Sequence, residues 1–180
     1  MSGQFAGKTV AITGAAGGIG QWLCRFFGEE GATIAALDRN EKVAELVDTL
    51  GGYGIMAKAA VADIASADAV KAAFAGFGDV HLLINNAGVS RHPTLGATDP
   101  AGWEADLASN LNGAYACAHA VLPQMVARRA GSIVNVGSVN GLSALGDPAY
   151  SAESPLTDPT LTIEPERRAT ICGSTAWAQA

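Results

Sequence analysis

Short apolar runs alternate along most of the chain with segments whose apolar residues recur at helical spacing. We predict strands over 8–13, 32–37, 53–60, 80–84 and 132–136, and helices over 18–30, 41–50, 66–77 and 99–129, the last one broken near Gly113. The predicted strands are apolar almost throughout, which is typical of a parallel sheet covered by helices on both faces. The pattern therefore predicts a doubly wound α/β fold.

Beyond Tyr150 the regular pattern ends, because three prolines interrupt any helix. The only periodic feature expected there is a weak amphipathic helix after Pro165. A chain of 180 residues, 49% of them hydrophobic, is long enough to bury one substantial core. We therefore expect one domain over 1–152, followed by an atypical tail over 153–180.

The overall charge and hydropathy argue against two kinds of partner. The net charge is −6 and the pI is near 4.9, so the clustered Lys and Arg that a nucleic acid would require are lacking. No stretch is apolar over the length of a membrane-spanning helix, and residues 1–8 lack a signal-peptide pattern, so we expect a cytoplasmic protein.

The three cysteines are widely spaced and match no metal-ligand pattern, so neither a disulfide framework nor a metal site is predicted.

A cluster of glycines directly follows the first predicted strand and opens the first predicted helix. In the sequence T-G-A-A-G-G-I-G at 13–20, Gly14, Gly18 and Gly20 permit a tight turn whose backbone N–H groups face an anion such as a pyrophosphate. A glycine cluster alone also fits an ordinary loop. Its place between a strand and a helix favours a Rossmann-like dinucleotide site.

Asp38 closes the second predicted strand, where a carboxylate can accept hydrogen bonds from the ribose hydroxyls of adenosine. Because it would repel a 2′-phosphate, NAD is favoured over NADP. Arg39 complicates this prediction, since a guanidinium beside the ribose could pair with a 2′-phosphate. An alternative for Asp38 is a surface or helix-capping acid ahead of Glu41.

An ordered set of short motifs resembles the short-chain dehydrogenases/reductases, in the shorter form of that family. The motifs are T-G-A-A-G-G-I-G at 13–20, D-I at 63–64, N-N-A-G at 85–88, S-N-L-N-G at 109–113, G-S-I-V-N-V-G-S at 131–138 and P-A-Y-S-A at 148–152. The resemblance implies the following cofactor-binding residues: Gly14, Gly18, Ile19 and Gly20 at the diphosphate, Asp63 and Ile64 at the adenine, Asn86, Ala87 and Gly88 after the fourth strand, and Tyr150. The asparagine pair at 85–86 could also simply stabilise a turn.

The resemblance also places Asn110, Ser138 and Tyr150 at the family's catalytic positions. Hydride transfer at a carbinol carbon needs a proton carrier on the oxygen, and a tyrosine hydroxyl can serve if its pKa falls from about 10 toward neutrality. Ser138 would hold the substrate oxygen, and Asn110 would organise a water and a backbone carbonyl that feed protons to the site. The alternatives are a turn residue for Ser138, a half-buried aromatic residue for Tyr150 and a helix kink for Asn110.

One position departs from the family pattern. The family has a lysine four residues after the tyrosine, where its ammonium anchors the nicotinamide ribose and lowers the tyrosine pKa. This chain has Ser154 there, no lysine follows Lys71, and Glu153 would oppose a phenolate. We therefore expect reduced turnover.

Family members also continue beyond this point, so the resemblance implies that the last strands of the fold are lacking. The strand over 132–136 would then be an unpaired edge unless the tail or another chain covers it. The family is usually homo-oligomeric, but much of its dimer-forming helix would be absent, which argues against the same assembly. We hypothesise a frame shift in the coding sequence near Ala152, because out-of-frame reading of codons for 172–179 permits R-V-N-G-L-G-P-G, which looks like family sequence.

The sequence thus predicts an oxidoreductase that transfers a hydride between NAD(P) and a small secondary alcohol or ketone. Two alternatives stay open, a catalytically silent dinucleotide-binding module and a non-functional fragment. Residues 89–95 and 141–147 would flank a substrate, but neither stretch carries a charge cluster that names one.

Overall fold

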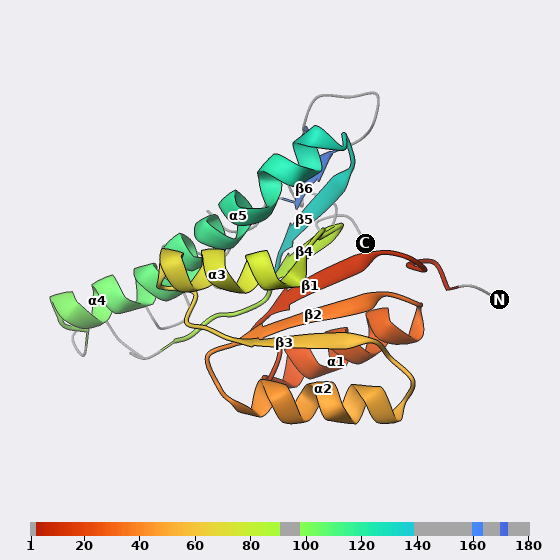
Figure 1. The fold of residues 1–180 in the computed structure, drawn as a ribbon. Helices are drawn as coiled ribbons and strands as arrows, with labels where there is room; N and C mark the ends of the chain where they lie inside the picture. Colours follow the sequence, from red (N-terminus) through yellow and green to blue (C-terminus); the bar gives the residue numbers. More distant parts are fainter. Residues whose placement is uncertain (1–2, 91–97, 139–159, 164–169, 173–180) are drawn as a thin grey trace, which may run out of the picture.

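Seven strands form one sheet in the order β3-β2-β1-β4-β5-β6-β7 in the computed structural model, which describes residues 3–90, 98–138, 160–163 and 170–172 (Figure 1). The strands are β1 (Thr9–Thr13), β2 (Thr33–Asp38), β3 (Ala57–Val61), β4 (Leu82–Asn85), β5 (Gly131–Asn135), β6 (Thr160–Ile163) and β7 (Thr170–Cys172). The helices are α1 (Gly18–Glu29), α2 (Lys42–Gly52), α3 (Ala67–Phe77), α4 (Pro100–Leu107), the π-helix η2 (Ala108–Asn112) and α5 (Gly113–Ala127).

The first five strands are parallel, as predicted, and β1 lies between β2 and β4. The chain runs outward from β1 to β3 on one side and then crosses back to β4 and β5 on the other. The strand order therefore reverses between β1 and β4. In open parallel sheets, this switch point at the carboxyl ends of the strands is where a ligand crevice forms.

Both faces of the parallel sheet are buried, which explains the nearly continuous apolar strands. In β1, Val10 and Ile12 join the core cluster that includes residues of α1 and α2, whereas Ala11 points to the opposite face. That opposite cluster includes Phe74 of α3 and Val121 of α5. Figure 1 shows the corresponding layers, with α1 and α2 below the sheet and α3 and α5 above it. The doubly wound α/β prediction is confirmed.

Side-chain caps mark the start of two helices, α3 and α4. The Ser66 hydroxyl accepts a hydrogen bond from the Ala69 N–H at 3.3 Å and so caps the N-terminus of α3. Asp99 caps α4 in the same way, accepting from the Gly102 N–H at 2.7 Å. The predicted break near Gly113 is a π-helical turn rather than an interruption, because the Gly113 N–H donates to the Ala108 carbonyl, five residues earlier.

The tail differs from the prediction. The strand β6 pairs antiparallel with β5, with Leu161 opposite Ile133, and β7 pairs antiparallel with β6. The edge of β5 is therefore covered by the tail. The helix expected after Pro165 is wrong at Thr170–Cys172, where the chain forms a strand instead. Short strands need no amphipathic period of their own when an existing edge offers unpaired backbone groups.

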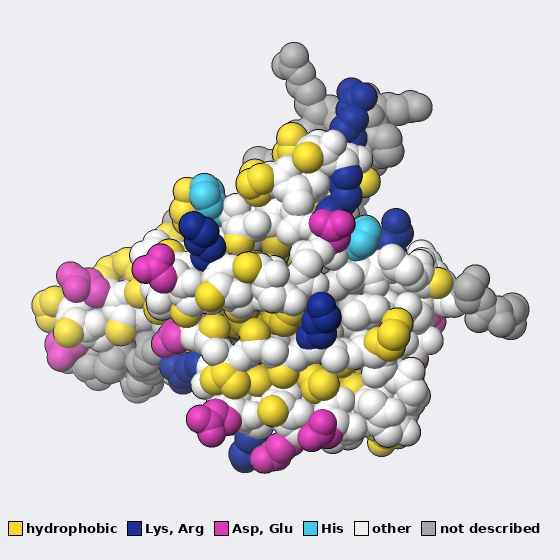
Figure 2. All heavy atoms as spheres, in the orientation of Figure 1, with side chains coloured by type: hydrophobic (Ala, Val, Ile, Leu, Met, Phe, Trp, Pro, Cys, Tyr) yellow, Lys and Arg dark blue, Asp and Glu magenta, His cyan; other side chains and the backbone are white. Residues whose placement is uncertain are grey.

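The molecular surface agrees with the acidic composition. Figure 2 shows acidic side chains gathered at the bottom of the view over α2, and others at the left over α4. Lys and Arg side chains on this face are spread over several elements. Within the described ranges, no helix has both the length and the apolar character needed to cross a membrane.

Candidate functional site

The glycine turn between β1 and α1 is packed too closely for side chains at two of its positions. Gly14 has a φ of +65°, and a Cβ there would lie 2.8 Å from the Cα of Ala87. A Cβ on Gly20 would lie 2.1 Å from the carbonyl oxygen of Gly14. The first turn of α1 contains no acidic residue, and its N-cap Gly17 uses no side chain to cap the helix. The helix N-terminus therefore offers its positive dipole end to an anion.

Asp38 lies at the end of β2 beside this turn. Its Oδ2 accepts a hydrogen bond from the Ala16 N–H at 2.9 Å, and its Oδ1 accepts one from the Asn40 N–H at 2.8 Å. These two bonds fix the carboxylate against the glycine turn. The helix-capping alternative is not what the structure shows, because α2 begins at Lys42, whose N–H is bonded to the Asn40 side chain instead.

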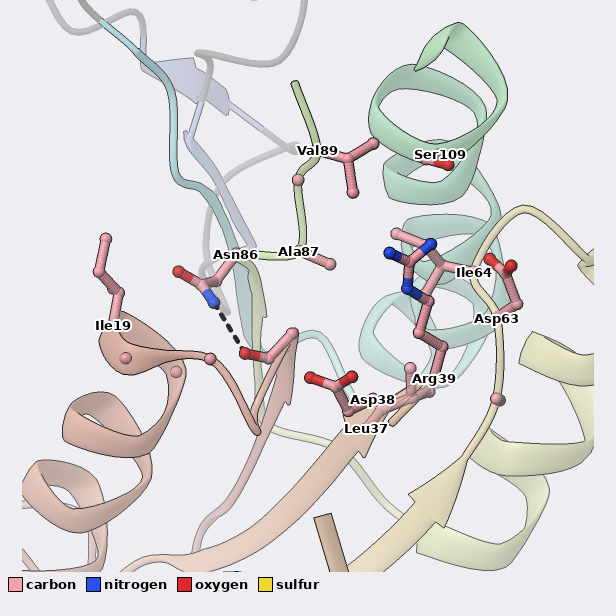
Figure 3. A pocket seen from close by; sticks show the side chains of 16 residues that line it. Ile19, Leu37, Asp38, Arg39, Asp63, Ile64, Asn86, Ala87, Val89 and Ser109 are labelled. Atoms are coloured by element: carbon pink, nitrogen blue, oxygen red, sulfur yellow. Dashed lines mark hydrogen bonds between the residues drawn. The ribbon is translucent and has the colours of Figure 1, made fainter. Parts of the chain in front are cut away.

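A cavity of about 350 Å³ opens between the glycine turn, the end of β2 and the segment after β4 (Figure 3). Apart from Tyr150, which lies outside the described residues, every predicted cofactor-binding residue lines it. These residues are Gly14, Gly18, Ile19, Gly20, Asp38, Asp63, Ile64, Asn86, Ala87 and Gly88. They come from four separate parts of the sequence, and the carboxyl edge of the sheet brings them together.

The cavity is also lined by Leu37, Ala62 and Ser109, which had no predicted role, and by Val89, which was predicted to flank a substrate. Ser109 belongs to the S-N-L-N-G motif, so its position in a matched motif was an available signal. Arg39 lines the cavity as well, and Figure 3 shows its side chain rising from the end of β2 between Asp38 and Ile64.

Thr13, the last residue of β1, joins the glycine turn to the segment after β4. Its Oγ1 accepts hydrogen bonds from the N–H groups of Asn86 at 3.1 Å and Ala87 at 3.0 Å. In return, Asn86 Nδ2 donates to the carbonyl oxygen of Thr13 at 3.0 Å. It also donates to the carbonyl oxygen of Gly14 at 3.3 Å, the bond dashed in Figure 3. The turn-stabilising interpretation of the asparagine pair therefore holds for Asn86, whose side chain also faces the cavity. A buried threonine at a strand end was a further signal that the sequence analysis missed.

Asn110 lies in the π-helix η2 and is 6% exposed. Its Oδ1 accepts from the Val89 N–H and its Nδ2 donates to the Val89 carbonyl, both at 2.8 Å. The side-chain amide therefore holds the segment after β4 in place. The expected role of Asn110 in organising a water and a backbone carbonyl stays a prediction, and the π-helical turn shifts backbone carbonyls from their α-helical partners.

A second cavity of about 310 Å³ adjoins the first, since both are lined by Ile19 and by residues 86–89. Asn110 and Ser138 line this second cavity, so two of the three predicted catalytic residues meet there. Tyr150 and Ser154 lie outside the described residues. The two cavities together follow the carboxyl edge from the end of β2 to the end of β5.

The buried cysteines have no signs of reactivity. Burial raises the pKa of the Cys24 and Cys117 thiols to about 12, so both are protonated and pack as small apolar side chains. No group of three or more His, Cys, Asp or Glu side chains suited to a metal ion occurs within the described part of the chain.

Comparison with known proteins identifies the family. Residues 8–153 match the family described as short chain dehydrogenase. The chain therefore belongs to the short-chain dehydrogenase family, as the motifs predicted. This match ends between Tyr150 and Ser154.

Solved structures show the same fold. An oxidoreductase of this family from Burkholderia thailandensis is 47% identical, with a TM-score of 0.77 over 82% of this chain and 58% of that one. A gluconate 5-dehydrogenase from Burkholderia cenocepacia, in complex with NADP and tartrate, is 38% identical (TM-score 0.78, 83% of this chain and 61% of that one). A 3-oxoacyl-[acyl-carrier protein] reductase from Brucella melitensis, with bound NAD, is 32% identical (TM-score 0.80, 84% and 62%). The chain also spans 55–60% of the length of the curated oxidoreductases that it matches.

Proposed function

We propose that this chain binds NAD along the two adjoining cavities and belongs to an oxidoreductase that interconverts a secondary alcohol and a ketone. The observation that carries the proposal is the glycine turn, whose backbone passes so close to Ala87 and Gly14 that only glycine fits at two positions. The helix α1 begins at Gly18 within this turn, and the backbone N–H groups of its first turn have no preceding helix carbonyl to bond, so they can bind a diphosphate. The anchored Asp38 carboxylate beside it has the chemistry to accept hydrogen bonds from a ribose.

The preference for NAD rests on Asp38. Each of its carboxylate oxygens accepts one backbone hydrogen bond, which leaves further lone pairs for the two ribose hydroxyls. A 2′-phosphate at the same place would meet the negative carboxylate. Arg39 would favour NADP instead, because its guanidinium could pair with the 2′-phosphate. The similar proteins of known structure include one with bound NADP and one with bound NAD. We therefore propose a preference for NAD, with weaker binding of NADP.

In the reaction, a bound nicotinamide would supply or accept the hydride. Ser138 would hold the substrate oxygen by a hydrogen bond in the second cavity, and Tyr150 would give or take the proton on that oxygen. Asn110 keeps the segment after β4 in position through Val89. Ser154 supplies no positive charge beside Tyr150, so proton transfer is expected to be slow.

An assay of NADH formation with a panel of secondary alcohols tests this function. We expect weak turnover by the unaltered chain and a rise of at least about tenfold in Ser154→Lys, because one unit of tyrosine pKa is worth a factor of ten. Full activity of the unaltered chain, equal to that of Ser154→Lys, would refute the role given to the missing lysine.

The second candidate, a catalytically silent dinucleotide-binding module, is favoured by the same Ser154. It predicts that NAD raises the melting temperature of the chain while neither the unaltered chain nor Ser154→Lys turns over any alcohol. A non-functional fragment predicts instead that no dinucleotide changes the melting temperature. Thermal melts with NAD and NADP, run beside the activity assay, separate these outcomes.

A further inference from the structure

Asn135 is the last residue of β5, and its Cα lies opposite that of Asn85 in the parallel register with β4. Asn85 Nδ2 donates hydrogen bonds to Asn135 Oδ1 at 2.8 Å and to the backbone carbonyl of Ala114 at 3.3 Å. One buried carboxamide therefore connects β4, β5 and the beginning of α5. The connection lies at the carboxyl edge of the sheet, beneath the second cavity that Asn85 and Asn135 both line.

The orientation of the Asn85 amide is determined by these partners. Both of its acceptors are oxygens, so turning the amide around would place its own oxygen against two others. Asn85 is 6% exposed, and its Oδ1 has no hydrogen-bond partner within the described structure. If Asn135 were lost, Asn85 would therefore keep only the longer of its two side-chain bonds. A buried polar group without a partner is costly, so the ends of β4 and β5 would be expected to shift.

Such a shift would reach the residues on both sides of the second cavity. Ser138 follows Asn135 by three residues, and the segment 86–89 follows Asn85 directly. The far end of that segment is tied to the π-helix, because Asn110 bonds both backbone groups of Val89. The start of the segment is tied to β1 by Thr13. Together with the backbone bond that the Val136 N–H donates to the Asn85 carbonyl at 2.9 Å, the bond between Asn85 and Asn135 sets β5, and with it Ser138, against this segment.

We propose that Asn135 is a positioning residue. Through Asn85 it fixes the separation between the Ser138 end of β5 and the segment 86–89, and so shapes the second cavity for the nicotinamide end of the dinucleotide. This inference rests on the proposed function. The first cavity, which would hold the adenosine diphosphate part, does not include Asn135 or Asn85 among its lining residues.

The test compares two ligands that differ in the nicotinamide. ADP-ribose would fill the first cavity, whereas NADH also enters the second and reports on it through nicotinamide fluorescence. In Asn135→Leu, which keeps the side-chain size but removes the acceptor, we expect the Kd of NADH to rise about tenfold and its fluorescence change on binding to shrink. The Kd of ADP-ribose should stay within about twofold of the unaltered chain.

Two further variants act as controls. Asn135→Asp keeps an oxygen that accepts from Asn85, so NADH affinity and the fluorescence change should largely return. Ser132→Ala alters the opposite end of the same strand, outside the lining of both cavities. It should change the Kd of neither ligand. If Asn135→Leu does not fold, Asn135→Ser replaces it, because the shorter hydroxyl side chain does not reach Asn85.

The outcomes are distinct. Equally weakened binding of both ligands would show that Asn135 only stabilises the sheet, and unchanged binding of both would show that it has no role. Either result would overturn the inference. Failure of ADP-ribose to bind the folded, unaltered chain would overturn the proposed function itself. A selective loss of NADH binding that Asn135→Asp restores is the result we expect.

Discussion

The two cavities at the carboxyl edge of the sheet are built in different ways. The first is made largely of backbone, from the glycine turn and the segment after β4, with Asp38 fixed in place by backbone N–H groups. The second is made from side-chain amides, because Asn85, Asn110 and Asn135 hold its walls together. A site made largely of backbone is most sensitive to substitutions that change the course of the chain, whereas one held by side-chain amides is sensitive to the loss of a single hydrogen bond.

The largest effect is expected from a substitution at Gly20, in the glycine turn that lines the first cavity. In Gly20→Ala the new Cβ would lie 2.1 Å from the Gly14 carbonyl oxygen, so the turn and the start of α1 must separate. We expect a loss of at least about 3 kcal/mol in the free energy of unfolding and a loss of NAD binding of at least about 100-fold. Chemical denaturation and calorimetric titration measure the two effects.

Gly51→Ala is the matched control for this substitution. A Cβ on Gly51, inside α2, would meet nothing within 4 Å. This variant should bind NAD normally and gain a few tenths of a kcal/mol, up to about 1 kcal/mol, because alanine favours a helix. Normal NAD binding by Gly20→Ala would show that the tight turn does not form the site.

Thr13→Val tests the connection between the glycine turn and the segment after β4. The substitution conserves shape but removes the Oγ1 that accepts from two backbone N–H groups, and Thr13 is 1% exposed. Leaving these donors unsatisfied should lower the free energy of unfolding by about 2 kcal/mol and weaken NAD and ADP-ribose together. Thr9→Val, at the other end of β1, serves as the control in the same denaturation and titration measurements. Equal effects of the two variants would count against the connection.

Asp38→Asn tests which dinucleotide the first cavity prefers. Loss of the carboxylate charge should weaken NAD binding about tenfold. NADP binding should weaken much less, because the repulsion of a 2′-phosphate disappears. Arg39→Ala should act in the reverse sense, weakening NADP more than NAD. Titrations of both variants with both dinucleotides give the ratios, and an unchanged ratio in Asp38→Asn would contradict the role of this carboxylate.

The smallest expected effect is on the pH dependence of stability, and it comes from His81 at the amino edge of the sheet, away from both cavities. The pKa of His81 is lowered, first by burial and then by the nearby charges of Arg128 and Lys8, with Asp79 acting weakly against them. Its Nδ1 accepts a hydrogen bond from the Thr9 N–H at 3.1 Å, which requires the neutral ring. The unfolded chain takes up a proton near pH 6.5 that the folded chain resists. The free energy of unfolding should therefore fall as the pH drops below about 6.5, and stop falling below the folded pKa.

His81→Gln should remove that part of the pH dependence, since glutamine does not titrate. Denaturant unfolding of both forms between about pH 5 and 8 gives the comparison, and NAD affinity should not change at pH 8. The same decline in stability below pH 6.5 in both forms would assign it to other groups.

Much of the fold could be predicted because the strands and helices of the first 138 residues have clear apolar periods. Each of the five predicted strands nonetheless differs at one or both ends by one to four residues. For example, β3 begins at Ala57 rather than 53, and β4 begins at Leu82 rather than 80. The strands β6 and β7 could not be predicted, because a short strand that adds to an existing edge has no period of its own. The parallel topology then brought every described cofactor-binding prediction to one edge.

The parts of the site that escaped prediction depend on contacts between distant residues. Asn110 and Val89 are separated by 21 positions, and Asn85 and Asn135 by 50, so no local pattern reveals either pair. The π-helix likewise depends on how Ala108–Asn112 packs in the fold rather than on helix propensity. The role of Tyr150 stays a prediction, since it lies outside the described residues.

Calorimetric titration of the unaltered chain with NAD tests the central claim most directly. We predict saturable heat with one dinucleotide bound per chain, suppressed when ADP-ribose already occupies the first cavity. Absence of binding heat from protein that unfolds cooperatively, and is therefore folded, would contradict a dinucleotide site at the carboxyl edge of this sheet.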